Sequence, residues 1–131
     1  MSVKQVSVFM SNTEGRLLKV TDVLSSKGIN LLAASLAEAS DFGVIRLITE
    51  DADKAKEVLK EAGCSAKISD VVAVKVADEP GSLHAVLDSI KDFNIEYMYA
   101  MAVKGEQYII LKIHDYEKAE ASLTNAGFKL F

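Results

Sequence analysis

The chain has 131 residues, of which 50% are hydrophobic and only one is proline, a composition that favours a continuous globular body. Its formal net charge of −4 makes nucleic acids and anionic membranes poor candidate partners, because no basic stripe is present to neutralise phosphates. No apolar stretch is long enough to cross a bilayer and no secretory signal precedes the first strand, so we expect a cytoplasmic protein.

Two patterns in the sequence each occur twice in the same order. They are Gly15-Arg16-Leu17 with Gly81-Ser82-Leu83, and Leu59, Ala62 and Gly63 with Leu123, Ala126 and Gly127. Two homologous copies therefore fill the chain, and we predict two modules, residues 1–69 and 70–131. Either half alone would be marginal because a small domain buries a small fraction of its surface, so we expect the halves to fold together.

Hydrophobic periodicity predicts the same series of elements in each copy. The first copy should contain a strand around 6–10, a helix from Leu17 that ends near Gly28, strands at 31–37 and 44–49, a helix through 55–62 capped by Asp51, and a strand at 66–68. The second should contain a strand at 72–76, a helix from Leu83 that ends near 92–94, strands at 97–103 and 107–113, a helix through 119–126 capped by Asp115, and a strand at 128–131.

The order strand, helix, strand, strand, helix, strand is that of the ferredoxin-like fold, an α+β class. Right-handed crossovers place both helices of each module on one face of an antiparallel sheet. The other face then needs a cover, and the strand Tyr97 to Val103 is apolar on both sides. We therefore expect association through sheets or sheet edges, with a homodimer as the assembly.

The loop after the first strand of each copy offers candidate binding groups, because it places small polar residues and a glycine at the start of a helix. Unpaired N–H groups and the helix dipole there favour an anion such as a carboxylate, and glycine allows a ligand to approach the backbone. The alternative is a structural role. In that case Asn12 or Thr13 caps the first helix, and Asp78 or Glu79 caps the other, with Pro80 in its first turn.

The second loop, Asp78-x-Pro80-Gly81-x-Leu83, with Asn-Ile-Glu-Tyr at 94–97, resembles the signature of the ACT domain, a ferredoxin-like module that senses amino acids. The first copy carries the same frame in Gly15-x-Leu17 and Gly28-Ile29-Asn30. The whole chain is thus similar to small stand-alone tandem ACT proteins. Glu14 departs from the family's usual proline and adds a negative charge, which Arg16 is placed to offset.

The resemblance implies that an amino acid binds between modules, held by this loop of one module and the second strand of its neighbour. The matching positions are Asn12, Thr13, Gly15, Arg16, Leu17 and Asn30 in the first copy, and Asp78, Gly81, Leu83 and Glu96 in the second. Asn12 and Asn30 offer both donors and acceptors to a zwitterion, whereas ionised Asp78 and Glu96 only accept and would disfavour a carboxylate. We therefore expect the first copy to be the better site.

No set of residues with catalytic or metal-binding spacing is recognisable in the sequence. Cys64 is interpreted as a packing residue at a strand start, and His84 and His114 have no partners at metal-ligand spacing. We expect no metal, no cofactor and no enzymatic activity.

Two functional hypotheses follow. In the first, the protein is an allosteric regulatory sensor that binds an amino acid and passes its occupancy to its own assembly or to a partner enzyme. In the second, it is a regulatory subunit, similar in role to the small subunit of acetolactate synthase, that docks on a catalytic protein. The sequence names neither the amino acid nor the enzyme.

Overall fold

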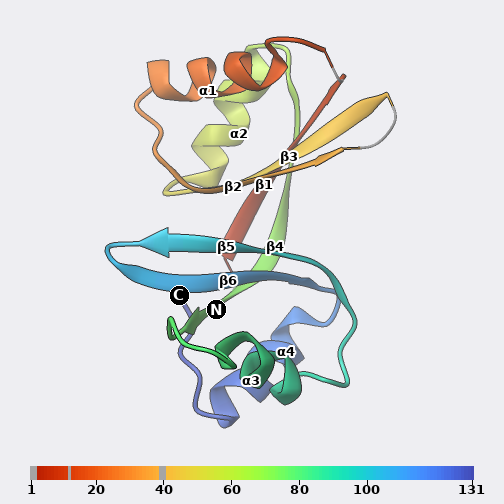
Figure 1. Cartoon of the computed structure of the whole chain (residues 1–131). Coiled ribbons are helices and arrows are strands. Elements are labelled where there is room, and N and C mark those ends of the chain that lie inside the picture. The colour runs from red at the N-terminus through yellow and green to blue at the C-terminus, as the bar shows by residue number, and fades with distance from the viewer. Residues whose placement is uncertain (1–2, 12, 39–40) are drawn as a thin grey trace. The chain divides into compact units, whose positions relative to one another are not determined.

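The computed structural model describes residues 3–11, 13–38 and 41–131 (Figure 1). Its elements are β1 (Val3–Ser11), α1 (Arg16–Ser26), β2 (Leu31–Glu38), β3 (Phe42–Thr49), α2 (Ala52–Glu61), β4 (Ser65–Val76), α3 (Ser82–Ser89), β5 (Ile95–Val103), β6 (Glu106–Ile113) and α4 (Tyr116–Asn125). The predicted series of strands and helices therefore occurs twice, which confirms the α+β, ferredoxin-like fold class.

The chain divides into two compact units. The N-terminal unit is Lys4–Ser69, and the C-terminal unit is Asp70–Phe131 together with Val3. The strand β4 runs through the division, whereas the sequence predicts separate strands at 66–68 and 72–76. That separation is wrong because the intervening residues contain neither glycine nor proline, so nothing interrupts the extended backbone.

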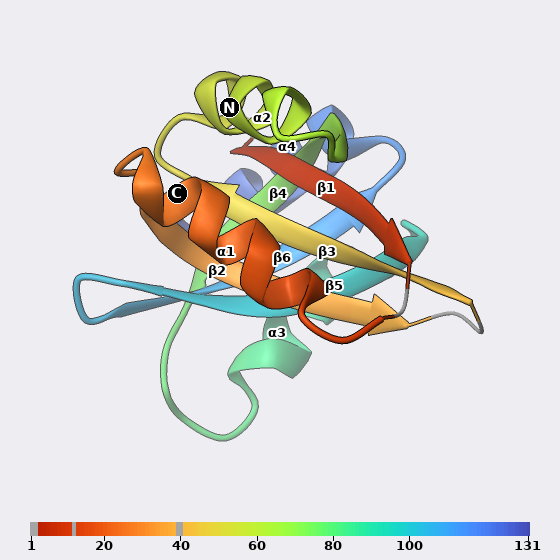
Figure 2. The same cartoon turned by 90° about the horizontal axis from the view of Figure 1, so that it is seen from above.

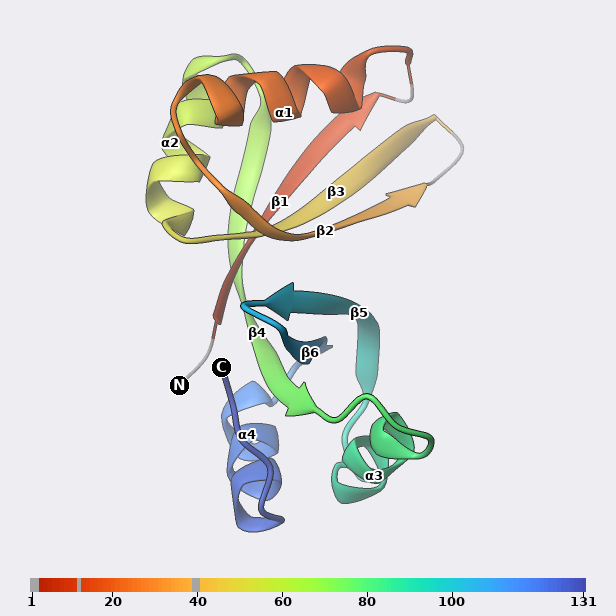
Figure 3. The ribbon, with the colours of Figure 1, turned by 60° about the vertical axis from the view of Figure 1, so that its left-hand side comes forward.

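In the N-terminal unit, β3 pairs antiparallel with both β1 and β2. β1 and β2 therefore run in the same direction, and β4 lies next to β1. Alternate residues of the strands face α1 and α2, which lie on the same side of the sheet (Figure 3). The core between them consists of Val6, Val8, Met10, Val20, Leu24, Ile45, Leu47, Ala55 and Leu59.

The C-terminal unit repeats this arrangement with the strand order β4-β6-β5, and α3 and α4 complete it (Figure 1). Its core consists of Val72, Val74, Val86, Ile90, Leu111, Ile113, Ala119 and Leu123. The strand predicted at 128–131 is reduced to a bridge between Leu130 and Val74. Two backbone bonds hold it, from Lys75 N to Lys129 O at 2.8 Å and from Phe131 N to Ala73 O at 2.9 Å.

The helix ends differ between the copies. α1 ends at Ser26, next to the predicted Gly28. α3 ends at Ser89, before the predicted stop at 92–94. Bonds from i+3 to i follow both helices, from Gly28 N to Ser25 O at 3.0 Å after α1 and from Ile90 N to Leu87 O at 3.2 Å after α3, where they begin before the predicted stop.

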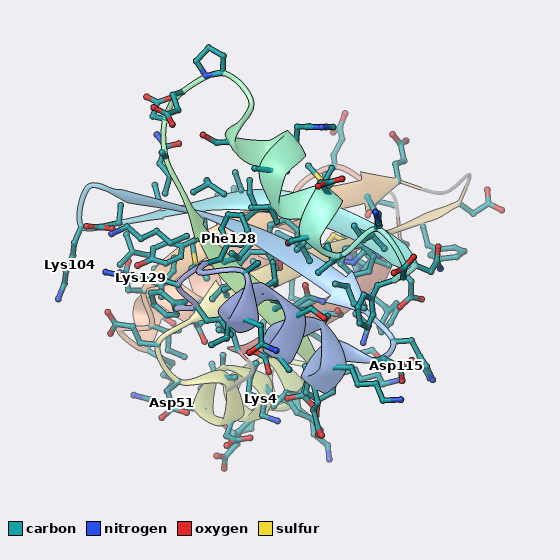
Figure 4. All side chains as sticks on the ribbon, turned by 90° about the horizontal axis from the view of Figure 1, so that it is seen from below. Lys4, Asp51, Lys104, Asp115, Phe128 and Lys129 are labelled. Carbon is teal, nitrogen blue, oxygen red and sulfur yellow. The ribbon has the colours of Figure 1, made fainter. Side chains whose placement is uncertain are left out.

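The two predicted aspartate caps have different geometry. Asp51 Oδ1 accepts a hydrogen bond from the backbone N–H of Lys54 at 3.1 Å, which confirms this cap of α2. Asp115 occupies the same position before α4 but makes no side-chain capping bond, so the predicted bond is wrong there. Figure 4 labels both aspartates, each beside the helix that it precedes.

We expect Asp51→Ala to lower the free energy of unfolding by about 1 kcal/mol, because the backbone N–H of Lys54 in the first turn of α2 loses its acceptor. Asp115→Ala is the matched control, since both variants lose a carboxylate near a helix start but only Asp51 loses a hydrogen bond. Urea denaturation measures both. Equal losses would contradict the assigned cap.

Candidate functional site

The β1–α1 and β4–α3 loops have the same backbone geometry. Gly15 precedes α1 with φ 75°, and Gly81 precedes α3 with φ 87°, a left-handed conformation that favours glycine. The carbonyl of Gly15 accepts from Lys19 N, and that of Gly81 from Ala85 N, both at 2.9 Å. The sequence repeat is therefore also a repeat of the turn that starts each helix.

The alternative that these loops supply side-chain caps is wrong for the described residues. Neither Thr13 nor the acidic pair Asp78 and Glu79 caps a helix, and the N-cap position belongs to glycine in both loops. Pro80 precedes this position rather than standing in the first helical turn. Asn12 lies outside the described residues. Because glycine has no side chain to offer, the N–H groups of Leu17 and Leu18 keep their capacity to bind an anion, whereas Arg16 N donates to Thr13 O at 3.4 Å.

A cavity of about 440 Å³ lies beside this turn in the N-terminal unit. Figure 2 and Figure 3 show the first turn of α1 near the ends of β1 and β2 and the start of β3. The residues that line the cavity are Met10, Ser11, Thr13, Gly15, Arg16, Leu17, Leu18, Leu36, Glu38 and Gly43. One helix start and three strand termini therefore form one cavity.

The cavity brings together four of the six residues predicted in the first copy, namely Thr13, Gly15, Arg16 and Leu17. Asn30 is not among them. It precedes β2, and since β1 and β2 run in the same direction, it lies at the opposite end of the sheet from the β1–α1 loop. A site containing both Asn30 and this loop requires a second module.

Sequence analysis missed the part of the cavity that the sheet contributes. The missed residues are Met10, Ser11, Leu18, Leu36, Glu38 and Gly43. The predicted topology contained a usable signal for five of them, all except Leu18, because strands that run parallel in a ferredoxin-like module end on the same side. The ends of the first and second strands and the start of the third should therefore surround the loop.

Among the described residues, the cavity carries one positive and one negative side chain together with apolar ones. Arg16, which is half-buried, comes from the first turn of α1, and Glu38 comes from the end of β2. The same cavity is lined by apolar side chains from both the helix and the sheet. A small zwitterion with an apolar portion matches this arrangement chemically, because each charge has a partner of opposite sign.

The corresponding residues of the C-terminal unit lie at two ends of its sheet. Asp78 and Gly81 are exposed in the β4–α3 loop and Leu83 is half-buried in α3, whereas the exposed Glu96 lies at the other end of the sheet. Two larger cavities of this unit, of about 620 and 550 Å³, lie against α4 and the β5–β6 turn. None of these four residues lines either cavity.

The cavity at the β5–β6 turn contains an ion pair. Lys75 of β4 contacts Glu106 of β6, and a hydrogen bond with Glu106 raises the pKa of Lys75 above its ordinary value. Both side chains are well exposed, so the pair contributes little to stability. Figure 4 labels Lys104 and Lys129, which also line this cavity.

The remaining candidates have structural or surface positions. Cys64 is half-buried and packs against the N-terminal core, as predicted, and His84 and His114 are exposed. Within residues 3–11, 13–38 and 41–131, no group of three His, Cys, Asp or Glu side chains could hold a metal ion. In the same part of the chain, no helix combines the length and the apolar character needed to cross a membrane.

The structure is thus a duplicated ferredoxin-like module with a glycine turn at the start of a helix in each copy. Residues 1–129 match the family model described as an ACT domain pair. The chain belongs to this family, whose modules are regulatory. No curated protein sequence matches the chain.

Solved structures agree with this assignment. Protein BT0572 from Bacteroides thetaiotaomicron is 36% identical with a TM-score of 0.92, and the match covers 100% of this chain and 92% of that one. The regulatory subunit of aspartate kinase from Thermus thermophilus is 20% identical with a TM-score of 0.64, covering 95% and 92%. Aspartokinase III of E. coli, in complex with lysine and aspartate, is 16% identical with a TM-score of 0.59, covering 97% and 32%. The last two show a similar fold.

We expect Gly15→Ala to lower the free energy of unfolding by about 1–2 kcal/mol, because a Cβ is unfavourable in the left-handed conformation. No atom lies within 4 Å of the added Cβ, so the cost comes from the backbone alone. Gly15→Asn is the control and should recover part of the loss, since asparagine tolerates this conformation. Thermal denaturation of both variants tests the turn, and an unchanged Gly15→Ala protein would exclude the assigned geometry.

Proposed function

We propose that the protein is a regulatory protein that binds a free amino acid in the cavity beside the β1–α1 loop. The observation that carries the proposal is a cavity of about 440 Å³ at a glycine-started helix without a described side-chain cap, in a member of the ACT domain pair family. The α-carboxylate lies against the first-turn N–H groups of α1 and the Arg16 guanidinium, and the α-ammonium faces Glu38. The contacts formed need no catalytic group, and we propose a non-enzymatic, cytoplasmic protein.

We further propose that a neighbouring module completes the site. The neighbouring module contributes its Asn30, which directly precedes β2, because an asparagine amide can donate to a carboxylate and accept from an ammonium group. Because Asn30 and the cavity lie in the same unit, the neighbour that contributes Asn30 is the N-terminal unit of a second copy in a homodimer. Asp78, Gly81, Leu83 and Glu96 form the equivalent set in the C-terminal unit, where two carboxylates make it the weaker site for an amino acid.

Ligand occupancy changes the assembly or a catalytic partner only if the ligand prefers one of two arrangements. The regulatory subunits of aspartate kinase among the similar structures support a partner enzyme of amino-acid metabolism as the second candidate function. The two functions are separable by experiment. A catalytic protein that copurifies with the chain favours the docking subunit, whereas a ligand-dependent melting shift of the isolated protein favours the sensor.

A melting screen of the full chain with each of the twenty amino acids tests binding, because a ligand at a hundredfold excess over its dissociation constant stabilises the folded state by about 2.7 kcal/mol. Arg16→Gln should weaken the best ligand about tenfold through the lost charged hydrogen bond. Lys19→Gln is the control, since it removes the same charge from an exposed position of α1 that does not line the cavity. If the two variants lose affinity equally, Arg16 is not a direct contact.

Asn30→Ala should weaken the same ligand by about tenfold, the cost of one or two polar contacts. Because Asn30 and the β1–α1 loop lie at opposite ends of the sheet, such a loss must act through a neighbouring module. Lys27→Ala, at an exposed position in the preceding turn, is the control. Titration calorimetry measures both, and unchanged affinity in Asn30→Ala would place the second half of the pocket elsewhere.

A further inference from the structure

We infer that the ligand of the N-terminal cavity is an amino acid with an uncharged aliphatic side chain, of the leucine, isoleucine, valine or methionine class. The inference rests on the proposed function and assigns the ligand's side chain. Its basis is the apolar wall of the cavity, which we call the leucine wall and define as Met10, Leu17, Leu18 and Leu36. The wall lines the same cavity as the charged side chains of Arg16 and Glu38.

The leucine wall is built from both sides of the cavity. In the sheet, Leu36 of β2 is in register with Ile45 and Val8, two core residues, so its side chain leaves the sheet on the face that α1 covers. Met10 lies one pair further along that face. Leu17 and Leu18 come from the first turns of α1. A side chain placed between helix and sheet therefore meets methyl groups on two sides.

Three members of the leucine wall remain exposed in the chain by itself. Leu17 is 41% exposed, Leu36 57% and Leu18 71%, whereas Met10 at 6% forms the closed base. Apolar side chains gathered around a cavity gain free energy when an apolar group displaces water from them. An aliphatic ligand side chain provides this gain, and a polar one does not.

The charges in the cavity exclude a charged ligand side chain. Arg16 and Glu38 are the charged residues among those that line it. The α-carboxylate and the α-ammonium of any amino acid use both. The additional charge of a lysine or an aspartate would then be placed against the leucine wall without a partner, which is unfavourable. The charged residues Arg16 and Glu38 also favour a zwitterion over the purely apolar surface of another protein.

Gly43 leaves room for the ligand side chain. It pairs with Met10 in the register of β1 and β3 and with Glu38 in that of β2 and β3, so its missing side chain would lie on the cavity face. A Cβ at this position would lie 3.7 Å from Leu36 Cδ1 and 3.3 Å from the Ala37 carbonyl oxygen. The absence of this carbon keeps the space beside Leu36 open.

The first experiment measures melting temperature for the full chain with leucine, isoleucine, valine and methionine against glycine, serine, lysine and aspartate. We expect at least one aliphatic amino acid to bind at least tenfold more tightly than every member of the second group. Equal or tighter binding of serine, lysine or aspartate would overturn the aliphatic assignment and leave the proposed function standing. A melting temperature that no amino acid raises would overturn both.

The second experiment changes the leucine wall. Leu36→Asn should reduce the preference for the best aliphatic amino acid over glycine by about tenfold, with glycine binding unchanged. Met98→Asn is the matched control, because Met98 is 42% exposed on β5, the counterpart of β2 in the C-terminal unit. Leu18→Asn is the second variant if Leu36→Asn does not fold. Unaltered selectivity in the wall variant that folds would overturn the inference.

Sedimentation of the same variants distinguishes a ligand from a second copy of the chain as the cover of the leucine wall. We expect the assembly state of the ligand-free Leu36→Asn protein to match that of the parent chain. Dissociation of an oligomer by Leu36→Asn without a change in selectivity would assign the wall to a subunit interface and overturn the inference.

Discussion

The central strand β3 pairs antiparallel with both β1 and β2, and the candidate site depends on this constraint. Because β1 and β2 then run in the same direction, both end beside the loop that enters α1. The end of β1, the end of β2, the start of β3 and the first turn of α1 meet around one cavity as a result. The same pairing places Asn30 at the far end of the unit.

The glycine turn at the start of α1 leaves the helix without a side-chain cap from its N-cap residue. A serine, threonine or aspartate at the N-cap would use its side chain to satisfy the first-turn N–H groups. Gly15 instead turns the chain in a left-handed conformation and contributes only backbone. The positive end of the helix dipole therefore remains available to an anion from outside the helix, and Arg16 adds a full charge beside it.

The two copies share the same backbone turn but differ in the residues around it. Gly81 repeats the turn of Gly15 almost unchanged, and α3 has no side-chain cap either. The residues around the two turns differ in charge, since Arg16 is replaced by Ser82, and Asp78 adds a carboxylate to the second loop. The same backbone turn therefore has a different chemical environment in each copy.

The sequence by itself determined the order of the elements, the duplication and the glycine turn of the β1–α1 loop. These features depend on local periodicity and on turn residues such as Gly15, which act within a few positions of the chain. It did not separate the aspartate that caps, Asp51, from the one that does not, Asp115, because a capping bond depends on side-chain geometry rather than on residue type. The predicted topology places the ends of β1 and β2 near the β1–α1 loop, but only the tertiary structure decided that the side chains of Leu36 and Glu38 line one cavity with it and that Asn30 does not. Strand pairing brings together residues far apart in the chain, and no local pattern encodes which strand ends share a cavity.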